Sequence, residues 1–154
     1  MPEAIQLASK TNTNIALLYI DGDNFKEVND QFGHDMGDHF LKHFAENLEQ
    51  SVLQQYKIYR FGGDEFVIVI DQINDYMDEK SVMLETIIQS IQYTFKKGWM
   101  IDTIHFSPTI SIGVSIFPHD GHTVNELLIN ADVALYEAKK LGKNNFVYSS
   151  AVHP

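Results

Sequence analysis

Two adjacent glycines, Gly62 and Gly63, separate two apolar runs that favour β-strand formation. The first run spans residues 56–61 and the second spans residues 66–70, and both are rich in aromatic or β-branched side chains. Two strands with so short a Gly-Gly connection predict a β-hairpin, because glycine supplies the positive φ that tight primed turns require. A fold for this chain therefore has to contain an antiparallel strand pair at this point.

The tip of this hairpin carries two carboxylates, Asp64 and Glu65, directly after the glycines. Successive side chains of a strand point to opposite faces, so the two acids cannot both be idle on one solvated face. Glycines also let a ligand approach the backbone closely, because they carry no side chain. Bare backbone beside paired acids predicts a site for phosphate and metal.

Length, charge and cysteine content limit the classes of protein to which the chain can belong. At 154 residues it fits one domain that buries roughly 70% of its unfolded surface, and 44% apolar content argues against disorder. The net charge of −10 argues against a nucleic-acid partner, although an acidic site can hold a triphosphate through divalent cations. No apolar run approaches the ~20 residues of a membrane span, no signal peptide opens the chain, and cysteine is absent. We therefore expect a cytoplasmic domain without membrane contact of its own, even if other segments anchor its parent protein.

The periodicity of apolar residues predicts an α+β fold. Residues 1–14 are polar without a clear period and are expected to be a residual connector, whereas residues 15–150 are expected to form one domain. Strands are expected at 15–20, on both sides of the two glycines, at 101–106 paired with 109–117, and at 146–148. Helices are expected directly after Asp21 and at 40–52, 82–95 and 124–141, with a loop at 71–80. This order predicts an antiparallel-rich central sheet covered by helices, nearest to the ferredoxin-like arrangement.

Asp21 stands at the end of the strand predicted at 15–20, whose continuous apolar run is typical of a strand buried on both faces. An EF-hand calcium loop starting there is excluded, because its fifth and sixth positions hold Phe25 and Lys26. If this strand and the hairpin are neighbours, three carboxylates converge at one sheet edge, where hard oxygen ligands suit magnesium. Taken one at a time, each acid is equally consistent with a solvated turn residue.

Lys139 and Lys143 are one helical turn apart at the end of the last predicted helix. Two interpretations stay open: the cations complement the negative end of the helix dipole, or they reach the phosphates of a bound triphosphate. His39 and His43 also have helical spacing. Without a third ligand within reach, they indicate a solvated helix face rather than a zinc site.

Five blocks of this chain, in order, resemble the motifs of the GGDEF family of diguanylate cyclases. Gly62 to Phe66 reads GGDEF, the signature that names the family. The other blocks are DGDNFKEVND at 21–30, FGHDMGD at 32–38, SIGVS at 111–115 and ADVALYEAK at 131–139. Together they cover almost the whole of residues 15–148, and the resemblance implies the palm-like sandwich of nucleotidyl cyclases.

The resemblance implies two divalent ions, Mg²⁺ or Mn²⁺, in each active site. Asp21 and Glu65 would hold the metals, with the carbonyl of Gly22 as a backbone ligand. Asp64 would be a further ligand or the base near the ribose 3′-hydroxyl. Asp64 and Glu65 would thus be the catalytic pair of the signature.

The resemblance also implies how a triphosphate would be held. Backbone amides around Asn24, Phe25 and Lys26 would bind phosphates at a helix start, which agrees with the preference of helix N-termini for anions. Lys139 and Lys143 would contact the terminal phosphates. The family therefore favours the second of the two interpretations of these lysines.

Guanine would be read by Asn29 and Asp38. A carboxylate accepts hydrogen bonds from N1–H and the exocyclic amine of guanine and is left unpaired by adenine, so this pair should select GTP. Gly62 and Gly63 would let the nucleotide lie against the hairpin. The implied reaction joins two GTP molecules into cyclic di-GMP with release of two pyrophosphates. Each domain supplies half of the reacting pair, so a homodimer is required and the monomer should be inactive.

Three features depart from the family pattern. Residues 53–56 read LQQY where relatives often carry an inhibitory Arg-x-x-Asp, so we expect no product inhibition through that site. Lys143 stands where many relatives have arginine, which keeps the charge but loses the bidentate fork. Residues 1–14 lack the family's Asp-x-Leu-Thr segment, and no upstream sensory domain is present, so we expect an excised catalytic fragment or a shortened protein with a weakened site.

Two functions of different classes are consistent with these observations. The first is an active diguanylate cyclase, which the intact Asp21, Asp64 and Glu65 favour. The second is a catalytically idle domain that binds GTP and acts in regulation or interaction, which the missing front segment favours. Another cyclase or polymerase with a similar sheet is disfavoured by Asn29 and Asp38.

Overall fold

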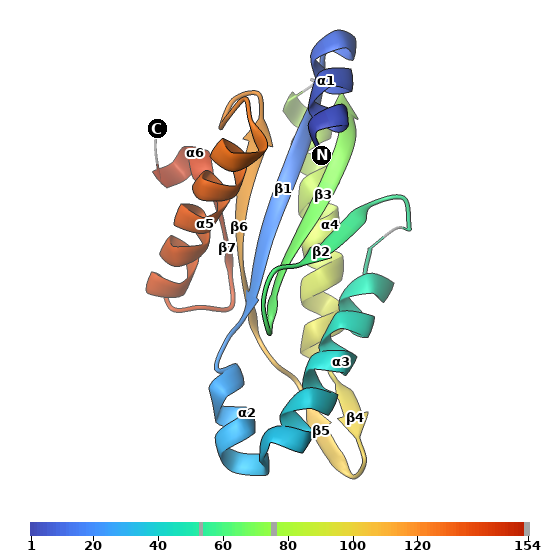
Figure 1. Cartoon of the computed structure of the whole chain (residues 1–154), viewed down its shortest axis with the longest axis vertical. Coiled ribbons are helices and arrows are strands. Elements are labelled where there is room, and N and C mark those ends of the chain that lie inside the picture. The colour runs from blue at the N-terminus through green and yellow to red at the C-terminus, as the bar shows by residue number, and fades with distance from the viewer. Residues whose placement is uncertain (53, 75–76, 153–154) are drawn as a thin grey trace.

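A five-stranded sheet in the order β2–β3–β1–β6–β7 lies at the centre of the molecule (Figure 1). The computed structural model describes residues 1–52, 54–74 and 77–152 of the chain. The strands of this sheet are β1 (Thr13–Gly22), β2 (Lys57–Arg60), β3 (Glu65–Asn74), β6 (Ile110–Phe117) and β7 (Phe146–Tyr148). Neighbouring strands are antiparallel except β6 and β7, which are parallel. This confirms the predicted α+β fold with an antiparallel-rich sheet.

Helices cover both faces of the sheet (Figure 1). They are α1 (Pro2–Thr11), α2 (Phe25–Phe32), α3 (His34–Gln50), α4 (Met77–Lys97), α5 (Val124–Lys140) and α6 (Ser149–Val152). Along β1, Leu18 and Ile20 pack in one hydrophobic cluster with α3 and α4, whereas Ile15 and Leu17 pack in a second cluster with α1 and α5. Because successive residues of a strand point to opposite faces, this double burial explains the continuous apolar run at 15–20.

Helix α5 begins and packs as its sequence predicts. The Thr123 hydroxyl accepts a hydrogen bond from the Glu126 amide, and the Glu126 carboxylate accepts one from the Thr123 amide, which completes a capping box. A Cβ placed on Gly113 of β6 would overlap the carbonyl oxygen of Ala131, so this glycine lets the helix approach the sheet closely. The close approach fixes the C-terminal end of α5, which carries Lys139.

We expect Gly113→Ala to destabilise the fold by about 3 kcal/mol, because the added methyl group meets helix backbone that cannot yield without shifting α5. Urea unfolding should show this as a lower midpoint with an unchanged m-value. Gly63→Ala is the matched control, since a Cβ there would meet nothing closer than Leu41 Cδ1 at 4.0 Å. Equal midpoints for the two variants would contradict this account of the packing.

The first difference from the sequence prediction lies at residues 1–14, which contain a helix, α1, and the start of β1 instead of a connector. Ala8 is buried in the cluster that joins α1 to the sheet, and Met1, Ala4 and Ile5 pack around it. These four positions have the i, i+3, i+4, i+7 spacing of a helix face, so the sequence did carry a signal for α1. The signal is weak because two of the four side chains are alanines and the pattern covers only two turns.

The second difference is a separate two-stranded hairpin of β4 (Trp99–Ile101) and β5 (Ile104–Phe106). The predicted pairing of 101–106 with 109–117 is wrong, because β5 pairs with β4, whereas β6 pairs with β1 and β7. Asp102 adopts a φ of 54° in the short connection between the two strands. Aspartate tolerates this left-handed conformation, so the chain reverses here without a glycine.

Two element boundaries also differ from the prediction. The loop expected at 71–80 is shorter, because β3 continues to Asn74 and α4 begins at Met77, while residues 75–76 lie outside the described residues. Helix α3 begins at His34, earlier than the predicted start, because the polar residues before the apolar stripe continue the same helix. Such ends carry little periodic signal and are set by packing.

The turn between β2 and β3 is wider than predicted, although the hairpin itself is confirmed. Gly62 and Gly63 are not among the described glycines with positive φ, so the prediction of a tight primed turn is wrong. The amides of Phe61 and Gly62 both donate to the carbonyl oxygen of Glu65, over 2.9 Å and 3.4 Å. These glycines therefore matter for the space that they leave, not for a left-handed backbone.

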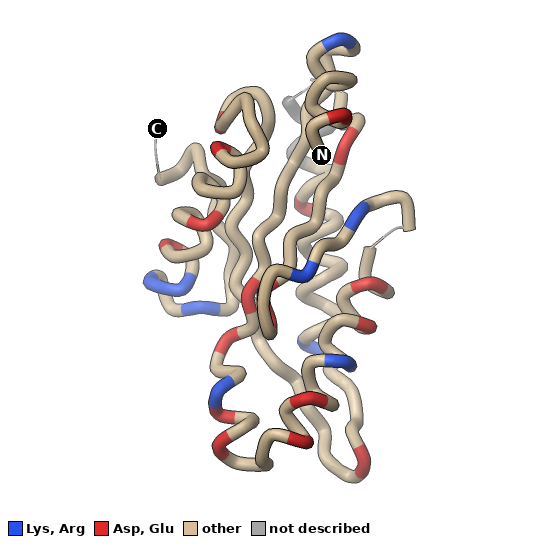
Figure 2. The backbone as a smooth tube through the Cα atoms, in the orientation of Figure 1, with Lys and Arg blue, Asp and Glu red and all other residues tan. Residues whose placement is uncertain are grey.

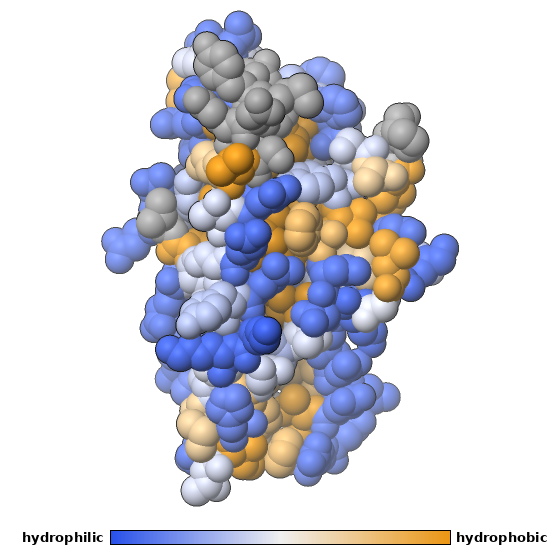
Figure 3. Space-filling view, turned by 180° about the vertical axis from the view of Figure 1, so that it is seen from behind, coloured by the Kyte–Doolittle hydropathy of each residue, from blue (hydrophilic) through white to orange (hydrophobic). Residues whose placement is uncertain are grey.

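None of the described helices combines the length and the apolar character needed to cross a membrane. Helix α4 is amphipathic, with Ile88 and Ile91 buried and Tyr93 exposed. Seen from behind, the hydrophobic surface is broken into patches by hydrophilic side chains (Figure 3).

Candidate active site

The end of β1 and the start of β3 lie side by side at one point of the sheet. In the antiparallel register, Asp21 is the cross-strand partner of Glu65. The amide of Gly22 donates a 3.2 Å hydrogen bond to the carbonyl oxygen of Asp64. The strands that carry the three acids are therefore neighbours, which was the condition for the predicted metal site.

The carboxyl group of Asp64 lies against Asp21 and the backbone of Gly22. A Cβ added to Gly22 would lie 2.7 Å from Asp64 Oδ2, so the absence of a side chain makes room for the carboxyl group. Burial, the charge of Asp21 and a hydrogen bond with Asp21 together raise the pKa of Asp64 to about 7. Two carboxyl groups this close repel each other when both are ionised, so a cation belongs beside them.

The ammonium group of Lys139 lies among the oxygens at the end of β1. Its Nζ is 3.1 Å from Asp21 Oδ2, 3.3 Å from the carbonyl oxygen of Gly22 and 3.3 Å from Asp23 Oδ1. Burial alone would lower the pKa of Lys139, but the hydrogen bond to Asp21 and the charges of Asp21 and Asp23 hold it above its usual value. Figure 2 shows the cationic end of α5 and the acidic ends of β1 and β3 at the same level of the molecule.

These oxygens have the chemistry of a site for a hard divalent cation. Carboxylate and carbonyl oxygens suit Mg²⁺ and Mn²⁺, and Asp21 and Gly22 already share the cation of Lys139. Glu65 is the cross-strand partner of Asp21, and its Oε2 lies 2.9 Å from where a Cβ of Gly62 would be. Within the described ranges, no three metal-ligating side chains are gathered around one point. The residues thus fit a metal held by carboxylates, a backbone carbonyl and a substrate, rather than by a closed protein cage.

The start of α2 lies directly beside this cluster. Asn24 adopts a φ of 64° and turns the chain from β1 into the helix, whose first residues are Phe25 and Lys26. Lys143 Nζ donates a 2.8 Å hydrogen bond to Asn24 Oδ1, and Lys139 contacts the residues just before it. Backbone amides at a helix start, flanked by two cations, are suited to binding an anion such as phosphate.

Lys143 lies in the loop after α5 and not on the helix, so the predicted helical spacing of the two lysines is wrong. Helix α5 ends at Lys140, and Gly142, Lys143 and Asn144 have φ values of 119°, 65° and 51°. Non-glycine residues in the left-handed region cost roughly 1–2 kcal/mol each, so contacts elsewhere have to hold this loop. Helical periodicity cannot predict such a turn.

Asn29 on α2 packs against Gly37 on α3, which directly precedes Asp38. A Cβ placed on Gly37 would overlap Asn29 Oδ1, so the carboxamide of Asn29 occupies the space that a side chain at position 37 would fill. Asp38 follows Gly37 directly and is exposed. The structure thus places the carboxamide of Asn29 against the helix turn that carries the accessible Asp38. The contribution of Gly37 was not foreseen from the sequence.

Asp23 is a second residue that sequence reasoning did not assign. Its side chain is buried at the centre of this region. Burial would raise its pKa, but hydrogen bonds from Ser111, Asn144 and Thr109 and the charge of Lys139 hold the pKa of Asp23 below its usual value. Asp23 is the second aspartate of the segment Asp21-Gly22-Asp23, and this spacing was the signal in the sequence that could have drawn attention to it. The groups that surround Asp23 become known only from the fold.

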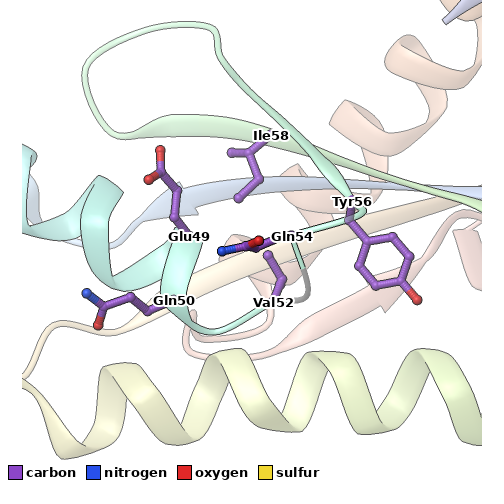
Figure 4. Close-up of a pocket in the computed structure, with 6 residues that line it drawn as sticks. All are labelled: Glu49, Gln50, Val52, Gln54, Tyr56 and Ile58. Atoms are coloured by element: carbon purple, nitrogen blue, oxygen red, sulfur yellow. The ribbon is translucent and has the colours of Figure 1, made fainter.

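A pocket of about 500 Å³ lies apart from this cluster, between the end of α3 and β2 (Figure 4). Its described lining consists of Glu49, Gln50, Val52, Gln54, Tyr56 and Ile58, which includes no cation for a phosphate. The pocket borders the stretch 53–56, in which Leu53 lies outside the described residues. The absence of product inhibition through this stretch stays a prediction.

Comparison with protein families relates the whole fold to one domain type. The family model described as "Diguanylate cyclase, GGDEF domain" matches residues 1–145, a range that includes α1. MucR of Pseudomonas aeruginosa, a bifunctional diguanylate cyclase/cyclic di-GMP phosphodiesterase, is 36% identical over 148 residues, which make up 96% of this chain and 21% of MucR. Diguanylate cyclase DosC of Escherichia coli is 37% identical over 138 residues, 89% of this chain and 29% of DosC. The chain thus spans less than a third of the length of either relative.

A solved structure shows the same architecture. The GGDEF domain of YfiN, also called TpbB, from Pseudomonas aeruginosa superposes with a TM-score of 0.86 at 27% sequence identity. The superposition covers 95% of this chain and 88% of that chain. The similarity therefore extends over nearly every described element.

Proposed function

Because the chain belongs to the GGDEF family of diguanylate cyclase domains, we propose that it joins two GTP molecules into cyclic di-GMP and releases two pyrophosphates. One observation carries this proposal: the cross-strand pair of Asp21 and Glu65 lies close to the start of α2, where Lys139 contacts Asp21 and Lys143 contacts Asn24. Oxygens suited to a divalent metal, next to a helix start suited to an anion, are what a metal–triphosphate substrate requires.

Asp21, the carbonyl of Gly22 and Glu65 are the groups that would hold two divalent ions, Mg²⁺ or Mn²⁺. When bound, the ions supply charge stabilisation at the phosphates and activation of the attacking hydroxyl. Asp64 would act as a further ligand or as the base for the ribose 3′-hydroxyl. The wide turn that precedes Asp64 keeps it at the same sheet edge as Asp21, because β1 and β3 are paired up to that point.

The phosphates would bind at the start of α2, on the backbone amides around Asn24, Phe25 and Lys26. Lys143 already donates to Asn24 at this point, and its ammonium group would contact the terminal phosphates. Lys139 would do the same from the other side, after its flexible side chain has left the oxygens of β1. Positioning and charge stabilisation of this kind are the main contributions that a protein makes to phosphoryl chemistry.

The base of the nucleotide would be read by Asn29 and Asp38. The packing of Asn29 against Gly37, the residue before Asp38, supports this role. Guanine presents N1–H, its amine and O6 along one edge, so a carboxylate and an amide can bind it together. Gly62 and Gly63 would let the nucleotide lie against the hairpin. A Cβ on Gly63 would meet nothing closer than 4.0 Å, so the surface there is open.

Gly37→Ala is expected to raise the KM for GTP about tenfold without lowering the thermal midpoint. The methyl group displaces the carboxamide of Asn29, whereas alanine favours the helix by about 1 kcal/mol over glycine, which offsets local crowding. Steady-state kinetics and thermal unfolding of the same preparation measure the two quantities. In an Asn29→Ala background, Gly37→Ala should leave the KM unchanged. Simple additivity of the two effects would show that Gly37 does not act through Asn29.

Two domains have to meet for the reaction, since each brings one GTP whose 3′-oxygen attacks the α-phosphate of the other. We propose a homodimer as the active form and an inactive monomer. The parent protein would carry an upstream sensory domain that controls this encounter, in line with the much greater length of MucR and DosC. Nucleic acid and membrane are not among the partners proposed for this domain, and we propose that it works in the cytoplasm.

A catalytically idle domain that binds GTP and regulates a partner is the second candidate. Lys143 favours it to a degree, because lysine cannot form the bidentate contact to phosphate that arginine forms. The open arrangement of the metal-ligating groups is compatible with it too, because two acids and a carbonyl can hold a nucleotide–metal complex without turnover.

Pyrophosphate release from GTP with magnesium, measured over a wide range of protein concentration, distinguishes the two functions. Specific activity that rises with concentration, with cyclic di-GMP as the product, is the result expected of a dimeric cyclase. Binding of GTP without turnover at every concentration would instead support the regulatory domain. Absence of GTP binding would contradict both.

A further inference from the structure

The carboxylate of Asp23 is completely enclosed, and both of its oxygens carry two hydrogen bonds. The side chain is 0% exposed. Oδ1 accepts from the hydroxyl of Ser111 over 2.8 Å and from Lys139 Nζ over 3.3 Å. Oδ2 accepts from the hydroxyl of Thr109 over 2.8 Å and from the backbone amide of Asn144 over 3.0 Å. A buried charge with this set of donors is fully satisfied without a metal ion.

These donors come from segments that are far apart in the sequence. Thr109 and Ser111 belong to the start of β6 and its approach, Lys139 to the end of α5, and Asn144 to the loop before β7. Asp23 itself follows Gly22 directly, and its amide donates to the carbonyl oxygen of Thr109 over 2.9 Å. One side chain thus ties the turn after β1 to the sheet and to the segment that carries both lysines.

The contact with Asn144 explains how the loop after α5 keeps its conformation. Lys143 and Asn144 are consecutive non-glycine residues with φ values of 65° and 51°. The Lys143 amide donates to the carbonyl oxygen of Ala138 over 3.1 Å, which closes the end of the helix. The next amide, of Asn144, finds its acceptor in Asp23. If this acceptor were lost, a buried hydrogen bond would no longer offset the left-handed backbone, and the loop would relax.

We propose that Asp23 is a positioning residue that fixes the two lysines of the phosphate site, Lys139 by direct contact and Lys143 through the backbone of Asn144. It would touch neither the substrate nor the metal. The proposal rests on the proposed GTP site for its effect on binding, but the contact itself can be tested without nucleotide. Asp23 would thus position the lysines, whereas Asp21, two residues earlier, would bind the metal.

Asp23→Asn tests the proposal, because it keeps the size of the side chain and removes the charge that holds both lysine segments. Binding of a non-hydrolysable GTP analogue in the presence of Mg²⁺ is expected to weaken about tenfold, from the loss of charge-assisted hydrogen bonds. Binding of GMP, which lacks the terminal phosphates, should change by less than a factor of about two. Equal losses for both nucleotides would overturn the proposal, because they would indicate general damage to the site.

The double variant Lys139→Met/Lys143→Met provides the matched background. If Asp23 acts through these lysines, Asp23→Asn should weaken binding of the GTP analogue no further there. A further tenfold loss in that background would mean that Asp23 acts on the substrate or metal by another route, and would also overturn the proposal.

Hydrogen exchange of the nucleotide-free protein tests the contact independently of the proposed function. In the wild type, the Asn144 amide should exchange as slowly as that of Leu141, which donates within the helix end to Glu137. Asp23→Asn should speed exchange at Asn144 about tenfold relative to Leu141. Fast exchange at Asn144 in the wild type would overturn the inference even if the variant did not fold. If the wild type bound no GTP, the proposed function would fail while this result still decided the role of Asp23 in the loop.

Discussion

Replacing Glu65 by glutamine is expected to lower the rate of cyclic di-GMP formation by at least about 100-fold, the largest effect that we anticipate from a single substitution. Glu65 is the cross-strand partner of Asp21, so its charge lies where the divalent ions would be held. Glutamine keeps the size and shape of the side chain but offers a neutral oxygen, which is a much weaker ligand for Mg²⁺. Initial rates of pyrophosphate release at saturating GTP give the value.

The variant should remain folded, because Glu65 lies at the start of its strand and is only half-buried. Glu46→Gln on α3 removes the same charge from an exposed position and should keep the wild-type rate. Direct binding of Mn²⁺ to the two variants separates loss of the metal from loss of chemistry. Retained activity in Glu65→Gln would refute the assignment of this residue as a metal ligand.

Asp38→Ser should reduce the preference for GTP over ATP by about 100-fold, mostly through weaker use of GTP. Asp38 is exposed and directly follows Gly37, against which the carboxamide of Asn29 packs, and its carboxylate can accept two hydrogen bonds from one guanine edge. Serine cannot replace both bonds to guanine. Adenine loses nothing, because its N1 is an acceptor and it has no amine at C2. The ratio of kcat/KM for GTP to that for ATP, measured with one preparation, reports the change.

Asp35→Ser is the control for this experiment, because Asp35 is an exposed acid in the first turn of the same helix. It should leave the nucleotide preference unchanged, although both variants lose one negative charge near the helix start. If Asp38→Ser kept the wild-type ratio, guanine would have to be read elsewhere and the proposed orientation of the nucleotide would be wrong.

The parts of the fold that sequence reasoning predicted are those that depend on local pattern. The buried strand β1, the hairpin around Gly62 and the capping box at Thr123 each have a signal within a few residues. The parts that it missed depend on distant partners. Asp102 supplies a reversal that pairs β5 with β4, and α1 has a short apolar face, half of it alanine, whose weak period gains meaning only from the sheet that it covers.

The candidate site also has parts that a local pattern predicts and parts that depend on distant residues. The neighbourhood of Asp21 and Glu65 was predicted only on the condition that their strands are neighbours, and the pairing of β1 with β3 meets that condition. Neither the loop position of Lys143 nor the burial of Asp23 could be predicted, since both depend on a contact between residues more than a hundred positions apart. A motif can show which residues belong together, but packing decides which of them support the others.

The resting place of Lys139 has a consequence for the order in which the site is assembled. Its ammonium group is tethered to α5 and serves as an internal counter-ion for Asp21 and Asp23 in the free protein. A bare divalent ion would have to displace this tethered cation from Asp21 and the Gly22 carbonyl and leave it with Asp23. A nucleotide that arrives with its metal offers Lys139 new oxygens as it gives up Asp21, so the exchange keeps every charge paired. We therefore expect metal and nucleotide to enter together, with Lys139 passing from Asp21 to the substrate's phosphates while it keeps its contact with Asp23.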